Sequence, residues 1–173
     1  GGPAGLRAAE VASREGISVT LFDAKPSVGR KFLVAGKGGL NITHGEPLEK
    51  FVTRYSGPSD FWQETIGNFT PTDLREWAAE LGVETFQATS GRVYPKALKA
   101  APLLRRWIAR LKEKGVVFEM NHRLTKVDRG FTLHFENGAI HETDAVILAL
   151  GGASWPQTGS DGKWTSFLTE LGI

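Results

Sequence analysis

The first 23 residues, GGPAGLRAAEVASREGISVTLFD, decide the fold class. Small and apolar residues predict a helix up to Arg14, which Gly16 can end in a left-handed conformation. Residues 17–22 are rich in Val, Ile, Thr and Phe, which predicts a buried strand that stops at Asp23. A glycine turn that runs into a helix and then a strand predicts an α/β fold with a parallel sheet.

The opening glycines match part of the dinucleotide-binding pattern G-x-G-x-x-G. Gly2 fits its second glycine, which lets the backbone approach a pyrophosphate, and Gly5 fits its third, which lets the helix pack closely on the sheet. The first glycine and the first strand are expected before residue 1. Asp23 follows Gly5 by 18 residues, where an acid accepts the ribose hydroxyls and favours FAD or NAD over NADP. An ordinary turn and a solvated aspartate at a strand end remain the alternatives.

The order of the later elements favours FAD over NAD. A long glycine-rich loop is expected over residues 25–46, and an irregular helical segment over 47–68 that is interrupted at Gly57-Pro58. Helices are expected from Thr70, as N-cap, to Leu81 and over 102–114, with Trp77 and Trp107 as core residues. A turn through residues 91–95 separates those two helices. Strands are then expected over 116–120, extending to 127, and over 131–143 as a hairpin that turns at Asn137-Gly138. An apolar strand over 145–150 ends in Gly151-Gly152, and a final helix covers 163–171. This order is similar to the glutathione-reductase-like FAD fold, in which a β-meander covers one face of the parallel sheet.

Composition excludes several classes of site and partner. The chain has no cysteine, so disulfides, thiolate metal sites and a redox-active dithiol are absent from it. No metal-ligand spacing appears, and no apolar run approaches the ~20 residues of a membrane span. The net charge of +2 does not predict the basic groove of a nucleic-acid-binding protein. One basic cluster is expected to be a solvated helix face: Arg105, Arg106, Arg110, Lys112 and Lys114.

Four segments resemble the YhiN/BaiN-like family of FAD-dependent oxidoreductases, also called the aminoacetone oxidase family: GGPAGLRAAE, GRKFLVAGKGGLNITH, GRVYPKALKA and VILALGGASWPQTGSDG. The resemblance covers essentially the whole chain. Two departures are Gly39-Leu40, where many relatives have Arg-Cys, and Leu150, where they have Thr. These departures bear on the substrate more than on FAD binding.

The resemblance implies a set of FAD contacts. The first turn and the ribose site would be formed by Gly2, Pro3, Ala4, Gly5, Asp23 and Ala24. The diphosphate and flavin side would be lined by Arg30, Lys31, Gly38 and Asn41. Leu124 would lie beside the adenine, and Ala149, Gly151 and Gly152 would form a second cofactor turn. From the residues alone, Gly29-Arg30-Lys31 is either a pyrophosphate-neutralising segment or an exposed basic loop.

These observations predict a partial FAD-binding domain over residues 1–173, truncated at both ends. The first strand, an inserted substrate domain and a C-terminal FAD segment are expected to be missing. The expected activity is hydride transfer between the flavin and an unidentified small molecule, with NAD(P)H as a candidate electron donor and no catalytic side chain assigned. A cytoplasmic location is the default expectation, without nucleic-acid or membrane partners. An RNA-modifying flavoprotein and a non-catalytic fragment remain open as alternatives.

Overall fold

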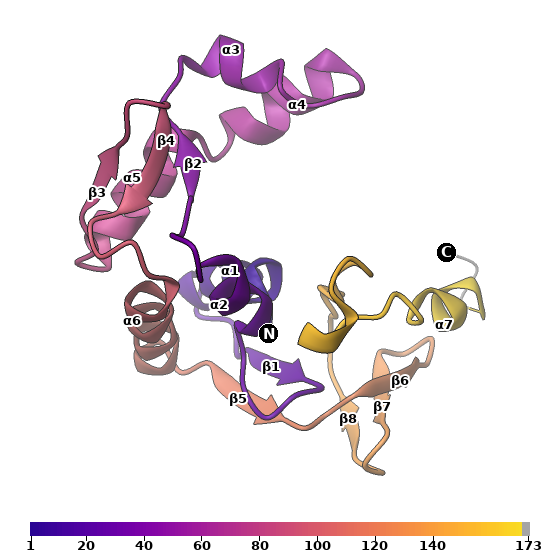
Figure 1. Ribbon diagram of the computed structural model, residues 1–173. Coiled ribbons are helices and arrows are strands. Elements are labelled where there is room, and N and C mark those ends of the chain that lie inside the picture. The colour runs from indigo at the N-terminus through magenta and orange to yellow at the C-terminus, as the bar shows by residue number, and fades with distance from the viewer. Residues whose placement is uncertain (171–173) are drawn as a thin grey trace. The chain divides into compact units, whose positions relative to one another are not determined.

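The computed structural model describes residues 1–170, which divide into two compact units (Figure 1). The first unit joins Gly1–Val34 to the chain from Ala109 onward, and the second is Ala35–Ile108. Helices α2 (Arg30–Ala35) and α6 (Ala100–Glu113) each cross a unit boundary in the sequence. The two units are described separately below.

The first unit begins with the α/β arrangement that the opening residues predict. Helix α1 (Pro3–Arg14) leads to β1 (Thr20–Asp23), which pairs in parallel with β5 (Val117–Met120). Gly16 ends the helix segment with φ 72°, as predicted. Strand β1 starts three residues later than expected because β5 pairs with it only from Thr20, and Ile17 is left 59% exposed.

A three-stranded antiparallel meander follows in the same unit. It is formed by β6 (Leu124–Val127), β7 (Thr132–Phe135) and β8 (Ile140–Glu142), with Asn137-Gly138 at the second turn. Val127, Leu133 and Phe135 are its buried core, against which Phe22 also packs. The continuous strand expected over 116–127 is wrong, since β5 and β6 belong to different sheets. Asn121, with φ 59°, turns the chain between them.

The strand predicted over residues 145–150 is also wrong. The backbone there pairs with no strand among residues 1–170. Ile147 is 69% exposed, while Val146 and Leu150 pack on the meander core. The 3-10 helix η1 (Pro156–Thr158) and helix α7 (Thr165–Glu170) follow, and the expected last helical residue, Leu171, lies outside the described residues.

The second unit is a small antiparallel sheet with helices. The sheet has the order β2-β4-β3, and α5 contacts β2 and β3 while α3 contacts α4 (Figure 1). Trp77 and Trp107 pack edge to face at 4.7 Å, as expected for core residues. The elements are β2 (Thr43–His44), α3 (Leu48–Val52), α4 (Ser59–Gly67), α5 (Pro71–Glu80), β3 (Thr85–Gln87) and β4 (Arg92–Pro95).

In this unit, some of the local structures predicted from the sequence are present and others are not. Thr70 is the N-cap of α5, with a complete capping box to Asp73. Residues 47–68 are helical on both sides of Gly57-Pro58, as predicted. The loop expected over 25–46 instead contains α2 and β2, and the expected turn over 91–95 is mostly strand β4, because both short strands gain their hydrogen bonds from each other.

Candidate dinucleotide site

The first glycine turn leaves open space at the start of α1. Gly2 is the N-cap residue, with φ −80° and ψ −179° and no side-chain cap. A Cβ built on Gly2 would meet no atom within 4 Å. Pro3 and Ala4, the first helical residues, are exposed. Because the first N–H groups of a helix lack internal acceptors, this end can receive a phosphate.

Asp23 lies against this turn. Its Oδ2 is 3.3 Å from the backbone nitrogen of Gly1, and its Oδ1 accepts a hydrogen bond of 2.8 Å from the Lys25 N–H. A Cβ on Gly1 would lie 2.1 Å from Asp23 Oδ2, so a side chain at residue 1 would displace this carboxylate. Gly29 N–H donates to Gly1 O over 2.8 Å, and the half-buried Ala24 follows the acid. The turn, the acid and the loop after β1 therefore form one group.

The second glycine turn lies close to α1. A Cβ on Gly5 would be 3.4 Å from the Cβ of Ala149, so α1 and residue 149 are in contact. Gly151 has φ 76°, and its carbonyl accepts a 3.0 Å hydrogen bond from Trp164 Nε1. Gly152 has open space around it. Gly2 and Gly152, which both have open space beside the backbone, thus belong to the same unit.

Of the two predicted cations, Lys31 connects helix α2 to the segment after the second turn. Its Nζ donates to Ser154 Oγ over 2.6 Å. Arg30 is exposed and donates to Ser27 Oγ over 3.3 Å. Leu124 packs on the meander core. The two basic side chains and the open helix start suit an anionic ligand, and Asp23 suits a hydroxyl donor, so this set fits a dinucleotide.

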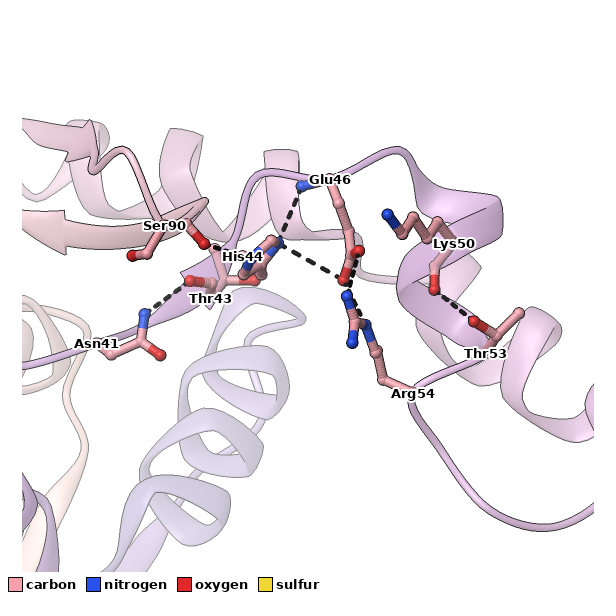
Figure 2. A network of polar contacts seen from close by, with 8 residues as sticks. All are labelled: Asn41, Thr43, His44, Glu46, Lys50, Thr53, Arg54 and Ser90. Carbon is pink, nitrogen blue, oxygen red and sulfur yellow. Dashed lines mark hydrogen bonds and ion pairs between the residues drawn. The ribbon is translucent and has the colours of Figure 1, made fainter.

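Two of the predicted contacts, Gly38 and Asn41, belong to the second unit. Gly38 has no atom within 4 Å of a built Cβ. Asn41 Nδ2 donates to Thr43 O over 2.7 Å and to Val93 O over 3.0 Å. Figure 2 shows the bond to Thr43, and the bond to Val93 joins this segment to β4. Their roles toward a cofactor stay predictions.

A buried carboxylate on α1 was not found from the sequence. Glu10 is fully buried, and its oxygens lie 3.0 Å from Arg7, 3.7 Å from Arg14 and 3.2 Å from Arg110. Arg7 precedes Glu10 by three residues and Arg14 follows it by four, and this helical spacing could have indicated part of the cluster. Arg110 joins α6 to α1, which no local pattern shows.

The basic face predicted on α6 is only partly solvated. Arg110 reaches Glu10, and Arg106 Nη1 donates to Leu81 O over 2.9 Å and to Gly82 O. Arg106 therefore satisfies carbonyls at the end of α5. Arg110 is half-buried, so its interpretation as a solvated side chain is wrong, whereas Arg106 is exposed and still bonded to these carbonyls.

Within residues 1–170, no group of three or more His, Asp or Glu side chains could hold a metal ion. No described helix is both long enough and apolar enough to cross a membrane.

The fold and its two glycine turns define a Rossmann-type α/β domain. Comparison with known families gives the family itself: residues 1–173 match the HI0933-like protein Rossmann domain, so the chain belongs to this family. This membership confirms the family resemblance seen in the sequence.

Curated relatives have two kinds of name. The chain is 28% identical to the 3-dehydro-bile acid delta(4,6)-reductase of Clostridium scindens, over 99% of the chain and 42% of the relative. It is 26% identical to the ribosomal RNA dihydrouridine synthases of Escherichia coli and Haemophilus influenzae, over 99% of the chain and 43% and 44% of those proteins. The chain thus spans about two fifths of the length of the curated relatives it matches. Among solved structures, THI4 of Thermovibrio ammonificans is similar at 16% identity and a TM-score of 0.45, over 78% of this chain and 45% of that one.

Proposed function

We propose that this chain is the FAD-binding part of a flavin-dependent oxidoreductase. The observation that carries the proposal is the position of Asp23, whose carboxylate lies 3.3 Å from Gly1 in the turn that precedes α1. A dinucleotide across this turn would place its pyrophosphate at the α1 N-terminus and its ribose hydroxyls at the carboxylate. The carboxylate also disfavours a ribose that carries a 2′-phosphate.

Each group of residues has a separate task in this proposal. The open backbone at Gly2, with Pro3, Ala4 and Gly5 behind it, admits the pyrophosphate. Arg30 and Lys31 offset part of its charge. Residues 149–152 approach the other half of the cofactor from the second turn. When bound, the flavin supplies hydride transfer, and the protein supplies position and electrostatics.

We infer that the reaction is a reduction of the substrate. The names of the two kinds of relative support this class. One specifies a reductase, and the other specifies a synthase of dihydrouridine, a nucleoside with two more hydrogen atoms than uridine. Electrons would enter from NADH or NADPH. We propose a small-molecule substrate over RNA because the net charge is only +2 and two of the basic side chains of α6 are held by Glu10 and the α5 carbonyls.

The test uses the full-length protein that carries this chain. It is purified, denatured, and examined for a released flavin spectrum, and apo-protein is titrated with FAD. The proposal expects released FAD or its uptake, followed by bleaching of the bound flavin with NADH or NADPH. A colourless protein that takes up no FAD would contradict it.

The same preparation separates the two substrate classes. The reduced flavin is mixed under anaerobic conditions with a steroid enone, or with a uridine-containing ribosomal RNA fragment. Faster reoxidation by the enone supports a small-molecule substrate. Faster reoxidation by the RNA fragment would contradict a small-molecule substrate and support an RNA-modifying enzyme.

A further inference from the structure

A hollow of about 480 Å³ lies in the second unit. It opens beside strands β2 and β4 and helix α3. We call it the β2–β4 hollow, and its lining residues are His44, Glu46, Phe51, Arg54, Ser90 and Arg92. All six belong to the same compact unit.

One wall of the hollow is a fixed ion pair. Glu46 accepts hydrogen bonds of 3.0 Å on each carboxylate oxygen from Nε and Nη2 of Arg54 (Figure 2). The Glu46 side chain is only 7% exposed, and the Arg54 hydrogen bond holds the pKa of Glu46 below its usual value. Both partners are thereby charged, and the pair contributes no net charge to the hollow.

His44 is also held in one orientation. Its Nε2 is 3.1 Å from Ser90 O, which can only accept, so this nitrogen carries the proton. Its Nδ1 can then accept from the Glu46 N–H at 3.3 Å. Gly91, with φ 81°, leaves space for the ring, since a Cβ there would lie 2.3 Å from His44 Cε1. The imidazole is therefore a preformed wall and not a free side chain.

Arg92 is the second arginine of the lining and, unlike Arg54, it is not paired with Glu46. It is the cross-strand partner of His44 in the β2–β4 ladder, so the two side chains lie on the same face of the sheet. Arg92 is exposed, and its guanidinium has no partner within residues 1–170. Phe51, half-buried on α3, adds an aromatic ring to the lining. The hollow thus offers one unpaired guanidinium and one ring between rigid walls.

We propose that the β2–β4 hollow binds the oxyanion of a small aromatic ligand, a carboxylate or a phosphate. Arg92 receives the oxyanion through its planar fork of N–H donors, and Phe51 packs against the ring to which the oxyanion is attached. The Glu46–Arg54 pair and His44 hold the site in shape. This inference does not depend on FAD binding.

The test is calorimetric titration of the full-length protein with phenyl phosphate, benzoate and inorganic phosphate. We expect at least one of the two aromatic anions to bind more tightly than inorganic phosphate, and the tighter of the two identifies the oxyanion. Arg92→Gln should weaken that binding about tenfold or more, the scale of a hydrogen bond to a charged group. Phe51→Leu should remove the advantage of the aromatic anions over inorganic phosphate.

Arg105→Gln is the matched control because Arg105 is exposed in the same unit and does not line the hollow. Circular dichroism confirms that each variant is folded. Unchanged binding in Arg92→Gln, an equal loss in Arg105→Gln, or no binding of either aromatic anion at millimolar concentration would overturn the proposal. The flavin spectrum of the same samples reports separately on the proposed function.

Discussion

The ammonium group of Lys31 donates to the hydroxyl of Ser154 over 2.6 Å, although 123 residues separate them. This contact connects helix α2 to the segment that follows the second glycine turn. The predicted pyrophosphate site and the predicted flavin-side turn are thereby held together within one unit.

Replacing Lys31 by Met should weaken FAD binding by roughly three- to tenfold, the scale of one exposed charged hydrogen bond. The reason is the loss of both a positive charge and this connection. The loss should shrink at 1 M salt, where exposed charges are screened. Fluorescence titration with FAD at two salt concentrations measures it. Lys37→Met, at another exposed lysine, should have no such effect.

Glu10→Gln should lower the free energy of unfolding by about 3 kcal/mol, because removing one partner of a buried ion pair leaves the others uncompensated. Glu10 is fully buried among Arg7, Arg14 and Arg110. Urea unfolding gives the value. The exposed Glu15→Gln is the control, and an equally small change in both variants would show that the arginine cluster adds nothing to stability.

Thr70→Ala should destabilise the protein by about 1 kcal/mol at neutral pH through loss of the α5 N-cap. The control is Thr72→Ala, at an exposed position inside the same helix. Urea midpoints compare the two. A Thr70→Ala protein as stable as Thr72→Ala would show that the capping box does not contribute.

The effect of Thr70→Ala should also depend on pH. Hydrogen bonds from the Thr70 backbone and side chain lower the pKa of Asp73 below its ordinary 3.8. A lowered folded-state pKa stabilises the fold above the unfolded-state value, and this stabilisation is lost as pH falls through the folded-state value. The difference between parent and variant should therefore narrow below about pH 4, and a difference that grows there would contradict the assignment.

Gly91→Ala should cost about 1–3 kcal/mol, since the new side chain would occupy a left-handed backbone position and meet the His44 ring. Gly67→Ala is the control, because Gly67 has open space around it inside α4 and no positive φ. Thermal unfolding distinguishes them. Equal melting temperatures for the two variants would mean that the contact between Gly91 and His44 is absent.

Features set by neighbouring residues could be predicted from the sequence. The Thr70 cap, the left-handed Gly16 and the turn at Asn137-Gly138 each depend on a few adjacent residues, and each is present. The alternation of apolar and polar residues along the meander strands could also be predicted, because one face of each strand must be buried.

Features that depend on a distant partner could not be predicted. Residues 145–150 have the composition of a buried strand, but a strand needs a neighbour to form its ladder. The same reason explains why β2 and β4 were expected as loop and turn.

The contacts of the candidate site also differ in whether the sequence could predict them. The pairing of Gly1 with Asp23 follows from the glycine spacing, whereas the contacts of Lys31 with Ser154 and of Glu10 with Arg110 join residues about a hundred positions apart. No periodicity connects such residues in sequence.

The most direct test of the account is the dissociation constant for FAD of the full-length protein and of its Asp23→Ala variant. We predict a loss of roughly 1.5–3 kcal/mol, which is about 10- to 150-fold. Asp23→Asn, which keeps the acceptor for the Lys25 N–H, and the exposed Asp144→Ala serve as controls for folding and for charge. An Asp23→Ala protein that is folded and binds FAD as tightly as the parent would contradict the assignment of the ribose to this carboxylate.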